Sequence, residues 1–291
     1  MKTKICILCL IALTTLTAQD IVSKKYEVPY KGEEELDASI DFGLGELTIA
    51  KGADREQLVE ALLEYDSDII TPVIDYKVLG NRGRLKMYTE DIDDIFVTSW
   101  KKRKRHDEGD FRRNSWVLAF GREVPISFDI DLGLGKGELD FTDLRVKDLR
   151  LECGMSDVVI EFRDVNREVL QNLSIESGLG NVEVYGIGNA NVERLDVECG
   201  LGSTTLSFDG DLQNLIKGQI SVGLGSVELQ IPEDVGVEVE AESSFLSSIN
   251  LPDFDEIDDD VYRSENWRKA DYRIYLIVEI GLGSVDIDWI D

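Results

Sequence analysis

Hydrophobic and polar positions alternate along most of this chain, and pairs of glycines interrupt the alternation at regular distances. In SVGLGSVELQIP, residues 221–232, apolar side chains occupy Val222 and Leu224, and then Val227 and Leu229 after a Gly-Ser pair. A period of two is typical of β-strands, and a change of parity indicates a bulge or a bend. Each copy therefore predicts two short strands joined at a glycine corner, with Val222 and Leu224 facing the same way.

The copies recur at a nearly constant interval. Their central apolar residues, at positions 134, 155, 179, 201, 224 and 246, are 21, 24, 22, 23 and 22 residues apart. A period near 22 with variable turns is typical of a solenoid of stacked coils. The fold class expected is therefore all-β, a single β-solenoid.

Stacking the coils aligns equivalent residues into rows. The first inward row expected comprises Leu134, Met155, Leu179, Leu201, Leu224 and Leu246, and the second comprises Val158, Val182, Thr204, Val227 and Ile249. A row of small polar residues recurs at the corner, namely Asn181, Ser203, Ser226 and Ser248. This polar row fits a ligand-binding track, and it equally fits a bend that needs small side chains.

Insertions separate two further copies, at residues 41–49 and 279–287, from this run. The first insertion predicts a β-hairpin from strand-like residues 71–78 and 85–88, while residues 58–65 fit either a helix or a strand. We expect the insertions to cover the terminal strands, because open sheet edges pair with other chains. The organisation predicted is a signal peptide (1–19), an N-terminal β region (20–130), solenoid repeats (131–252), and an acidic linker with C-terminal capping strands (253–291).

The N-terminus has the order of a secretory signal peptide. Lys2 and Lys4 precede an apolar run over residues 5–12, and small residues lead to Ala18 and Gln19. This pattern predicts an exported protein, periplasmic, cell-surface or extracellular, without a transmembrane segment after signal cleavage. Only Cys153 and Cys199 then remain, and coil stacking places them two rungs apart, about 9.6 Å, too far for a disulfide.

The charge balance is strongly acidic. The chain holds 31 Lys and Arg against 59 Asp and Glu, a formal net charge of −28. Such a field repels phosphate backbones, so no nucleic acid partner is expected. The exception is the basic run Lys101, Lys102, Arg103, Lys104 and Arg105, which is interpreted either as contacting an envelope partner or as a loop neutralised by neighbouring acids.

Long segments of the chain carry a family resemblance. LDASIDFGLGELTIAKGADREQLVEALLEYD, PVIDYKV and WVLAFGREVPISFDIDLGLGKGELDFTDLRVKDLRLECG resemble the toast-rack family of bacterial exported domains, and are similar to the C-terminal domain of LiaF-type envelope-stress regulators. The resemblance runs from about Leu36 onward. It implies a β-solenoid without a known catalytic site, a strand over 59–65, and a link to envelope stress.

The sequence carries no recognisable motif for catalysis or cofactor binding. The Gly-Leu-Gly copies are followed by strand-like residues and lack the third glycine and the helix of a dinucleotide loop. His106 is the single histidine, which excludes a Ser-His-Asp triad and a polyhistidine metal site. The acidic residues 253–260 are dense enough to attract calcium but lack the spacing and the glycine of an EF-hand loop, so they are interpreted as a solvated linker, with calcium binding as the alternative. No catalytic, cofactor or metal residues are therefore predicted.

The function expected is a non-enzymatic binding or adhesin-like module of the cell envelope. Its partner would be an envelope protein or a glycan. Two alternatives stay open, a glycan-acting β-helix enzyme with paired carboxylates and a purely structural surface repeat protein.

Overall fold

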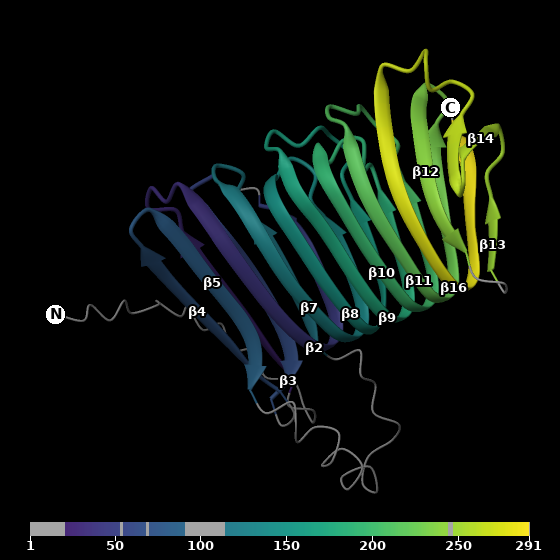
Figure 1. Ribbon diagram of the computed structural model, residues 1–291. Coiled ribbons are helices and arrows are strands. Elements are labelled where there is room, and N and C mark those ends of the chain that lie inside the picture. The colour runs from purple at the N-terminus through teal and green to yellow at the C-terminus, as the bar shows by residue number, and fades with distance from the viewer. Residues whose placement is uncertain (1–20, 53–54, 68–69, 91–113, 244–246, 291) are drawn as a thin grey trace, which may run out of the picture.

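Every regular element in the described part of the chain is a β-strand. The structure is a computed structural model, and it describes residues 21–52, 55–67, 70–90, 114–243 and 247–290. Figure 1 shows the long strands side by side, following one another from the N-terminal end of the stack to the C-terminal end. The all-β solenoid predicted from the repeats is confirmed.

Seven long strands form the body of the solenoid, and each contains one Gly-x-Gly copy or its equivalent. They are β2 (Glu35–Lys51), β7 (Pro125–Asp140), β8 (Arg145–Glu161), β9 (Leu170–Tyr185), β10 (Val192–Ser207), β11 (Ile216–Pro232) and β16 (Tyr272–Ile290). Neighbours in this order pair in parallel, and the copies align residue by residue. From β7 to β11, the register predicted from the repeat period is therefore observed.

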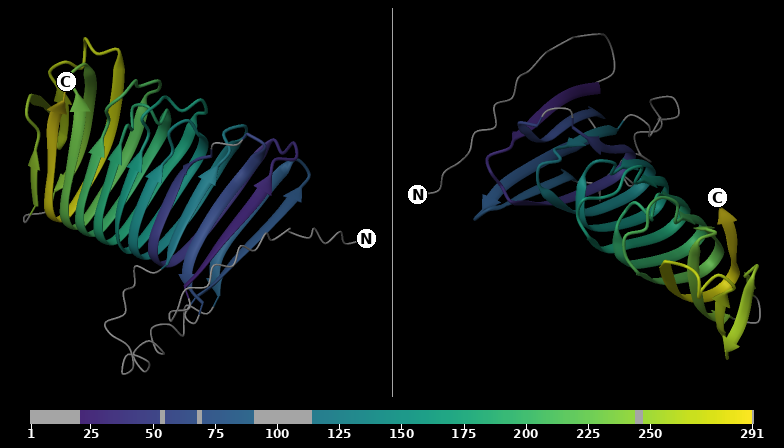
Figure 2. Two further views of the ribbon diagram at one scale, coloured as in Figure 1. Left: turned by 180° about the vertical axis from the view of Figure 1, so that it is seen from behind. Right: turned by 90° about the horizontal axis from the view of Figure 1, so that it is seen from above.

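Each long strand bends at its glycine corner, which divides it into a first arm before the corner and a second arm after it. The interior lies between the two rows of arms, and Figure 2 shows the same stack from behind and from above. Phe162, Ile187 and Leu212 in the connections between coils are also buried. Alternating apolar residues of both arms thus face one continuous core.

The first insertion extends the stack at its N-terminal end. β5 (Arg82–Glu90) pairs with the first arm of β2, and β4 (Thr71–Leu79) pairs with β5 in the predicted hairpin. β6 (Ser115–Phe120) pairs with the second arm of β2, followed by β3 (Gln57–Asp66) and then β1 (Ile21–Pro29). Residues 58–65 are therefore a strand, in agreement with the family resemblance.

The C-terminal end differs from a simple continuation of the repeats. β16 pairs directly with β11, and β12 (Val235–Ser243) and β13 (Ser247–Asn250) pair with the far side of β16. Val285 consequently lies between Val227 and Ile249 in the second inward row. The expectation that Ile249 follows Val227 was wrong, because the longer β16 offers a full partner to both arms of β11.

The acidic segment 253–260 is not a linker. β14 (Phe254–Asp258) and β15 (Val261–Ser264) form an antiparallel pair, and β15 extends the sheet from β12. The Phe254 ring stacks on Trp289 at 5.8 Å between centroids, and Trp289 Nε1 donates a 3.1 Å hydrogen bond to the Pro252 carbonyl. These contacts anchor the segment in spite of its charge.

Candidate functional site

The glycines of each corner allow the backbones of successive coils to approach closely. At Gly202, φ is +143°, and an added Cβ would lie 1.8 Å from the carbonyl oxygen of Gly180 in the preceding coil. At Gly135 the corresponding distance to the Gly45 carbonyl oxygen is 1.9 Å. Only glycine tolerates both this φ and this contact. The corner glycines are therefore required by stacking, as expected, and not by a phosphate.

The residue between the two glycines faces outward. In β11, Val222 and Val227 are buried, whereas Leu224 is 50% exposed. The prediction that Leu224 shares a face with Val222 was wrong. The strand turns between two inward residues five positions apart, so the residue at the apex of the bend points away from the interior.

The same outward position is repeated in all seven long strands. We call this row the leucine ridge: Leu44, Leu134, Met155, Leu179, Leu201, Leu224 and Leu282. Leu44 and Leu134 are half-buried, and the other five are 39% to 54% exposed. The predicted inward row of these residues is therefore corrected, while Leu246 lies outside the described residues. At about 4.8 Å per rung the ridge is about 29 Å long.

At each corner, the side chain that faces the interior belongs to the residue two positions before the ridge residue. This buried row comprises Phe42, Leu132, Cys153, Ser177, Cys199, Val222 and Ile280. Cys153 and Cys199 are free thiols two rungs apart, with Ser177 between them, as the repeats predicted. Burial, followed by the charge of Asp131, raises the pKa of Cys153 to about 12, so this thiol is not a nucleophile near neutral pH.

The small polar row lies beside the ridge on the second arms. Asn181 donates from Nδ2 to Asp157 at 2.9 Å, and Ser203 donates from Oγ to Asn181 at 2.5 Å. These bonds run from coil to coil, which favours the structural interpretation of the row over a ligand-binding track. Ser284 separates Ser226 from Ser248 in the observed order.

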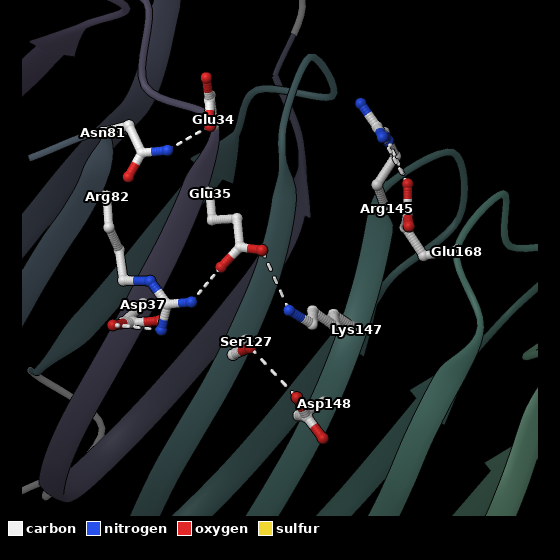
Figure 3. Close-up of polar contacts among 10 residues, drawn as sticks. All are labelled: Glu34, Glu35, Asp37, Asn81, Arg82, Ser127, Arg145, Lys147, Asp148 and Glu168. Carbon is white, nitrogen blue, oxygen red and sulfur yellow. Dashed lines mark hydrogen bonds and ion pairs between the residues drawn. The ribbon is translucent and has the colours of Figure 1, made fainter.

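A second group of polar side chains lies on the first arms near the N-terminal end, and Figure 3 shows its contacts. Arg82 of β5 pairs with Glu35 and Asp37 of β2, and Lys147 of β8 reaches Glu35 at 3.0 Å. Hydrogen bonding from Lys147, with the charge of Arg82, holds the pKa of Glu35 below its usual value. Because these charges compensate one another, the group connects the hairpin to the coils and offers little to a ligand.

The site residues predicted from sequence, Lys101, Lys102, Arg103, Lys104 and Arg105, lie outside the described residues, as do His106 and the signal segment. Across the five described ranges, no three His, Cys, Asp or Glu side chains are arranged to hold a metal ion. The same residues include no helix long and apolar enough to span a bilayer.

Sequence reasoning missed the leucine ridge as a surface feature. The sequence of β11 does indicate a bend. Val222 and Val227 both face inward but are five positions apart, so the alternation of inward and outward side chains must change between them. Which residue lies at the outer apex depends on where the coil bends. The ridge is thus a row of apolar side chains on the surface of a strongly acidic protein.

Comparison with curated proteins of known sequence found no match. Among solved structures, the chain is similar to "a putative cell adhesion protein" from Clostridium sporogenes, with 18% identity, a TM-score of 0.45, and coverage of 93% of this chain and 100% of that chain. It is also similar to "a putative adhesin" from Bacteroides fragilis, with 14% identity, a TM-score of 0.43, and coverage of 93% and 98%.

A family match agrees with the fold and with the resemblance seen in the sequence. Residues 17–185 match the N-terminal domain of toast_rack, DUF2154. The matched region extends from the N-terminal strands through β9 and includes four of the seven glycine corners. The chain belongs to the toast-rack family.

Proposed function

We propose that this protein is an exported, non-catalytic binding module of the cell envelope, and that its partner binds on the leucine ridge. The observation that carries the proposal is the row of five exposed apolar side chains from Met155 to Leu282, continued by two half-buried leucines. The glycines on either side explain the bend, but the bend does not require an apolar residue at its apex. A serine at the apex would satisfy the fold, so the repeated leucine points to a partner.

The remaining surface supports a binding role more than a catalytic one. The carboxylates of the described residues lie mainly along exposed outer faces of the arms. A glycan-cleaving enzyme needs two carboxylates in one cleft with separated pKa values. The exposed ridge, in contrast, presents a continuous apolar surface that can bind without turnover.

Site-specific crosslinking in the native cell tests the proposal. A photoreactive phenylalanine at position 201 or 224 should yield the same adduct, because both positions lie on the ridge. Leu215 is a matched control, since it is 44% exposed but lies nine residues before the corner of β11. Equal adduct yield from position 215 would refute a ridge-specific site.

A double serine variant, Leu201→Ser with Leu224→Ser, separates binding from folding. Each side chain is already about half exposed, so we expect a change in unfolding free energy of about 1 kcal/mol or less per site. The adduct formed from a third ridge position, 179, should nevertheless be lost. Retention of that adduct would show that the ridge does not carry the interaction.

Two parts of the proposal, export of the protein and a role for the basic run 101–105, are supported by the amino-acid sequence alone. Lys2, Lys4 and the apolar run before Ala18 support cleavage by a signal peptidase, which N-terminal sequencing of the mature protein tests. The run 101–105 is retained as a secondary contact for an envelope partner. The link to envelope stress rests on the resemblance to LiaF-type regulators.

A further inference from the structure

A row of carboxylates accompanies the leucine ridge along the first arms. Three residues before each ridge residue stand Asp41, Asp131, Glu152, Glu176, Glu198 and Glu279, with Ser221 as the one interruption. We call these six carboxylates the acidic ladder. Five of them are exposed and Glu152 is half-buried, so the charges lie beside the apolar row at the same rung spacing.

The acidic ladder is poorly compensated within the protein. Among the described residues, only Glu152 has an ion-pair partner in this ladder, which is Arg150. Burial, followed by the charge of Asp131, raises the pKa of Asp41. Asp41 and Asp131 stand on neighbouring rungs, so their like charges face one another. A ligand that brings positive charge to the ladder would relieve this repulsion.

The two sides of the ridge differ in charge. On the second arms, the first row beyond the corner carries Glu46, Lys136, Asp157, Asn181, Ser203, Ser226 and Ser284. From Asn181 onward this row is neutral. A partner lying along the C-terminal half of the ridge therefore meets apolar side chains at the centre, carboxylates on one flank and small hydroxyl or amide groups on the other.

A second copy of this protein does not match such a surface. Two chains that meet through their ridges each carry a formal net charge of −28, and this like charge opposes their contact. Anionic lipid and nucleic acid are disfavoured by the same charge.

The rung spacing favours a helix over an extended strand as the bound segment. Turns of an α-helix repeat every ~5.4 Å, so six turns span about 32 Å, close to the ~29 Å of the ridge. Same-face side chains of an extended strand repeat every ~6.7 Å and lose register after two or three rungs. An amphipathic helix can also present an apolar stripe to the ridge and basic residues, along the border of that stripe, to the acidic ladder.

We propose that the partner segment is a cationic amphipathic helix, with its apolar stripe on the leucine ridge and its Lys or Arg side chains on the acidic ladder. This inference rests on the proposed function, because it assigns the chemistry of the partner at that same site. The ridge supplies the apolar contact area, and the ladder sets the orientation and the charge selectivity.

Direct binding of designed peptides to the intact protein tests the inference. The probe is a 20-residue Leu/Lys peptide with leucine at helical spacing, and its counterpart has Glu in place of Lys. We expect the Lys peptide to bind and the Glu peptide not to bind. Leu201→Ser with Leu224→Ser should weaken binding at least about tenfold, since central apolar contacts dominate such interfaces.

Charge variants separate the ladder from the general acidity of the chain. Glu176→Gln with Glu198→Gln should weaken the Lys peptide about fivefold, from two partly screened charge contacts. The matched control is Asp164→Asn with Glu193→Gln. Both carboxylates are exposed, lie far from the corner and form no ion pair among the described residues. An equal loss in the control variant would mean that binding reflects net charge only and would overturn the inference.

The remaining outcomes are distinct. If the Lys peptide does not bind while crosslinking from Leu201 succeeds, the inference fails and the proposed function stands. If crosslinking from the ridge also fails, the proposed function fails with it. Dimerisation of the wild-type protein that disappears in the Leu201→Ser, Leu224→Ser variant would identify a second copy as the occupant and overturn the cationic helix.

Discussion

At the glycine corner, a single hydrogen atom in place of a side chain decides whether two coils can stack. The Cβ of an alanine at position 202 would overlap the Gly180 carbonyl oxygen, and φ there lies in the region that glycine alone adopts readily. The corner is held by backbone contact, which leaves the apex residue free to face solvent. The exposure of the leucine ridge is thus a consequence of glycines on either side of it.

Gly202→Ala should lower the free energy of unfolding by at least about 2 kcal/mol, from backbone strain together with overpacking. Urea denaturation measures this change. Gly80→Ala is the matched control, because φ there is also positive, at +70°, but an added Cβ meets no atom within 4 Å. The close approach would be excluded as the cause if both variants lost the same stability.

At the scale of elements, the N-terminal hairpin is attached through a buried carboxylate as well as through strand pairing. Glu33 is 3% exposed and accepts hydrogen bonds from the Tyr76 hydroxyl, at 2.6 Å, and the Lys31 amide, at 2.7 Å. Burial would raise the pKa of Glu33, but hydrogen bonds from Tyr76 and from backbone amides, together with the charge of Lys31, outweigh it and hold the pKa below its usual value. Burial and the same bond raise the pKa of Tyr76, which stays a donor.

Tyr76→Phe should destabilise the protein by about 1 to 3 kcal/mol at pH 7, because it removes one donor from a buried carboxylate. The pKa of Glu33 is lowered by folding, so its contribution is present above the unfolded value, about 4.3, and is lost as the pH falls through the folded value. The difference between wild type and variant should therefore shrink below pH 4. Denaturant titrations at pH 7 and pH 3.5 measure it.

Tyr88→Phe on the neighbouring strand β5 is the control for that experiment. The Tyr88 hydroxyl makes no hydrogen bond within the described residues, so its removal should cost less than about 0.5 kcal/mol at either pH. A Tyr76→Phe variant as stable as Tyr88→Phe would show that Glu33 does not anchor the hairpin.

At the scale of the whole molecule, the last strand has a structural role that its place in the chain does not suggest. β16 lies between β11 and β12, so the C-terminal strand is internal to the sheet while β14 forms an edge. The β14 edge carries Asp255, Glu256 and Asp258, and like charges of this kind oppose pairing with another sheet. The acidic hairpin therefore protects the end of the solenoid.

Deleting residues 271–290, which include β16, should unfold the strands that follow β11 and leave the preceding coils folded. We expect residues 235–264 to lose hydrogen-exchange protection, because β12 and β13 pair with β16 and make no pairing with β11. Hydrogen-exchange protection over residues 125–230 should persist. A control chain that ends at Pro232 should show the same protection over these residues. Continued protection of residues 235–264 would mean that β12 can replace β16 on β11.

Much of the fold follows from local pattern. The repeat period predicted the strands, their parallel register and the glycine corners. The strand-like runs on either side of a turn predicted the hairpin at 71–88, because a hairpin is also a property of short segments. The separation of Cys153 and Cys199 followed from the same register. The order of strands at the C-terminal end did not follow, because it depends on which distant segment forms the most complete pairing with β11.

Some features of the candidate site also follow from the sequence, and others depend on the tertiary structure. The sequence by itself determined that an apolar residue follows the first corner glycine in every coil, with an acidic residue three positions before that apolar residue in most coils. Only the tertiary structure decided that this apolar residue faces solvent, since the facing at a bend depends on how the arms enclose the core. Stacking then turned separate leucines and carboxylates into continuous rows, because parallel register brings residues about 22 positions apart to one rung spacing.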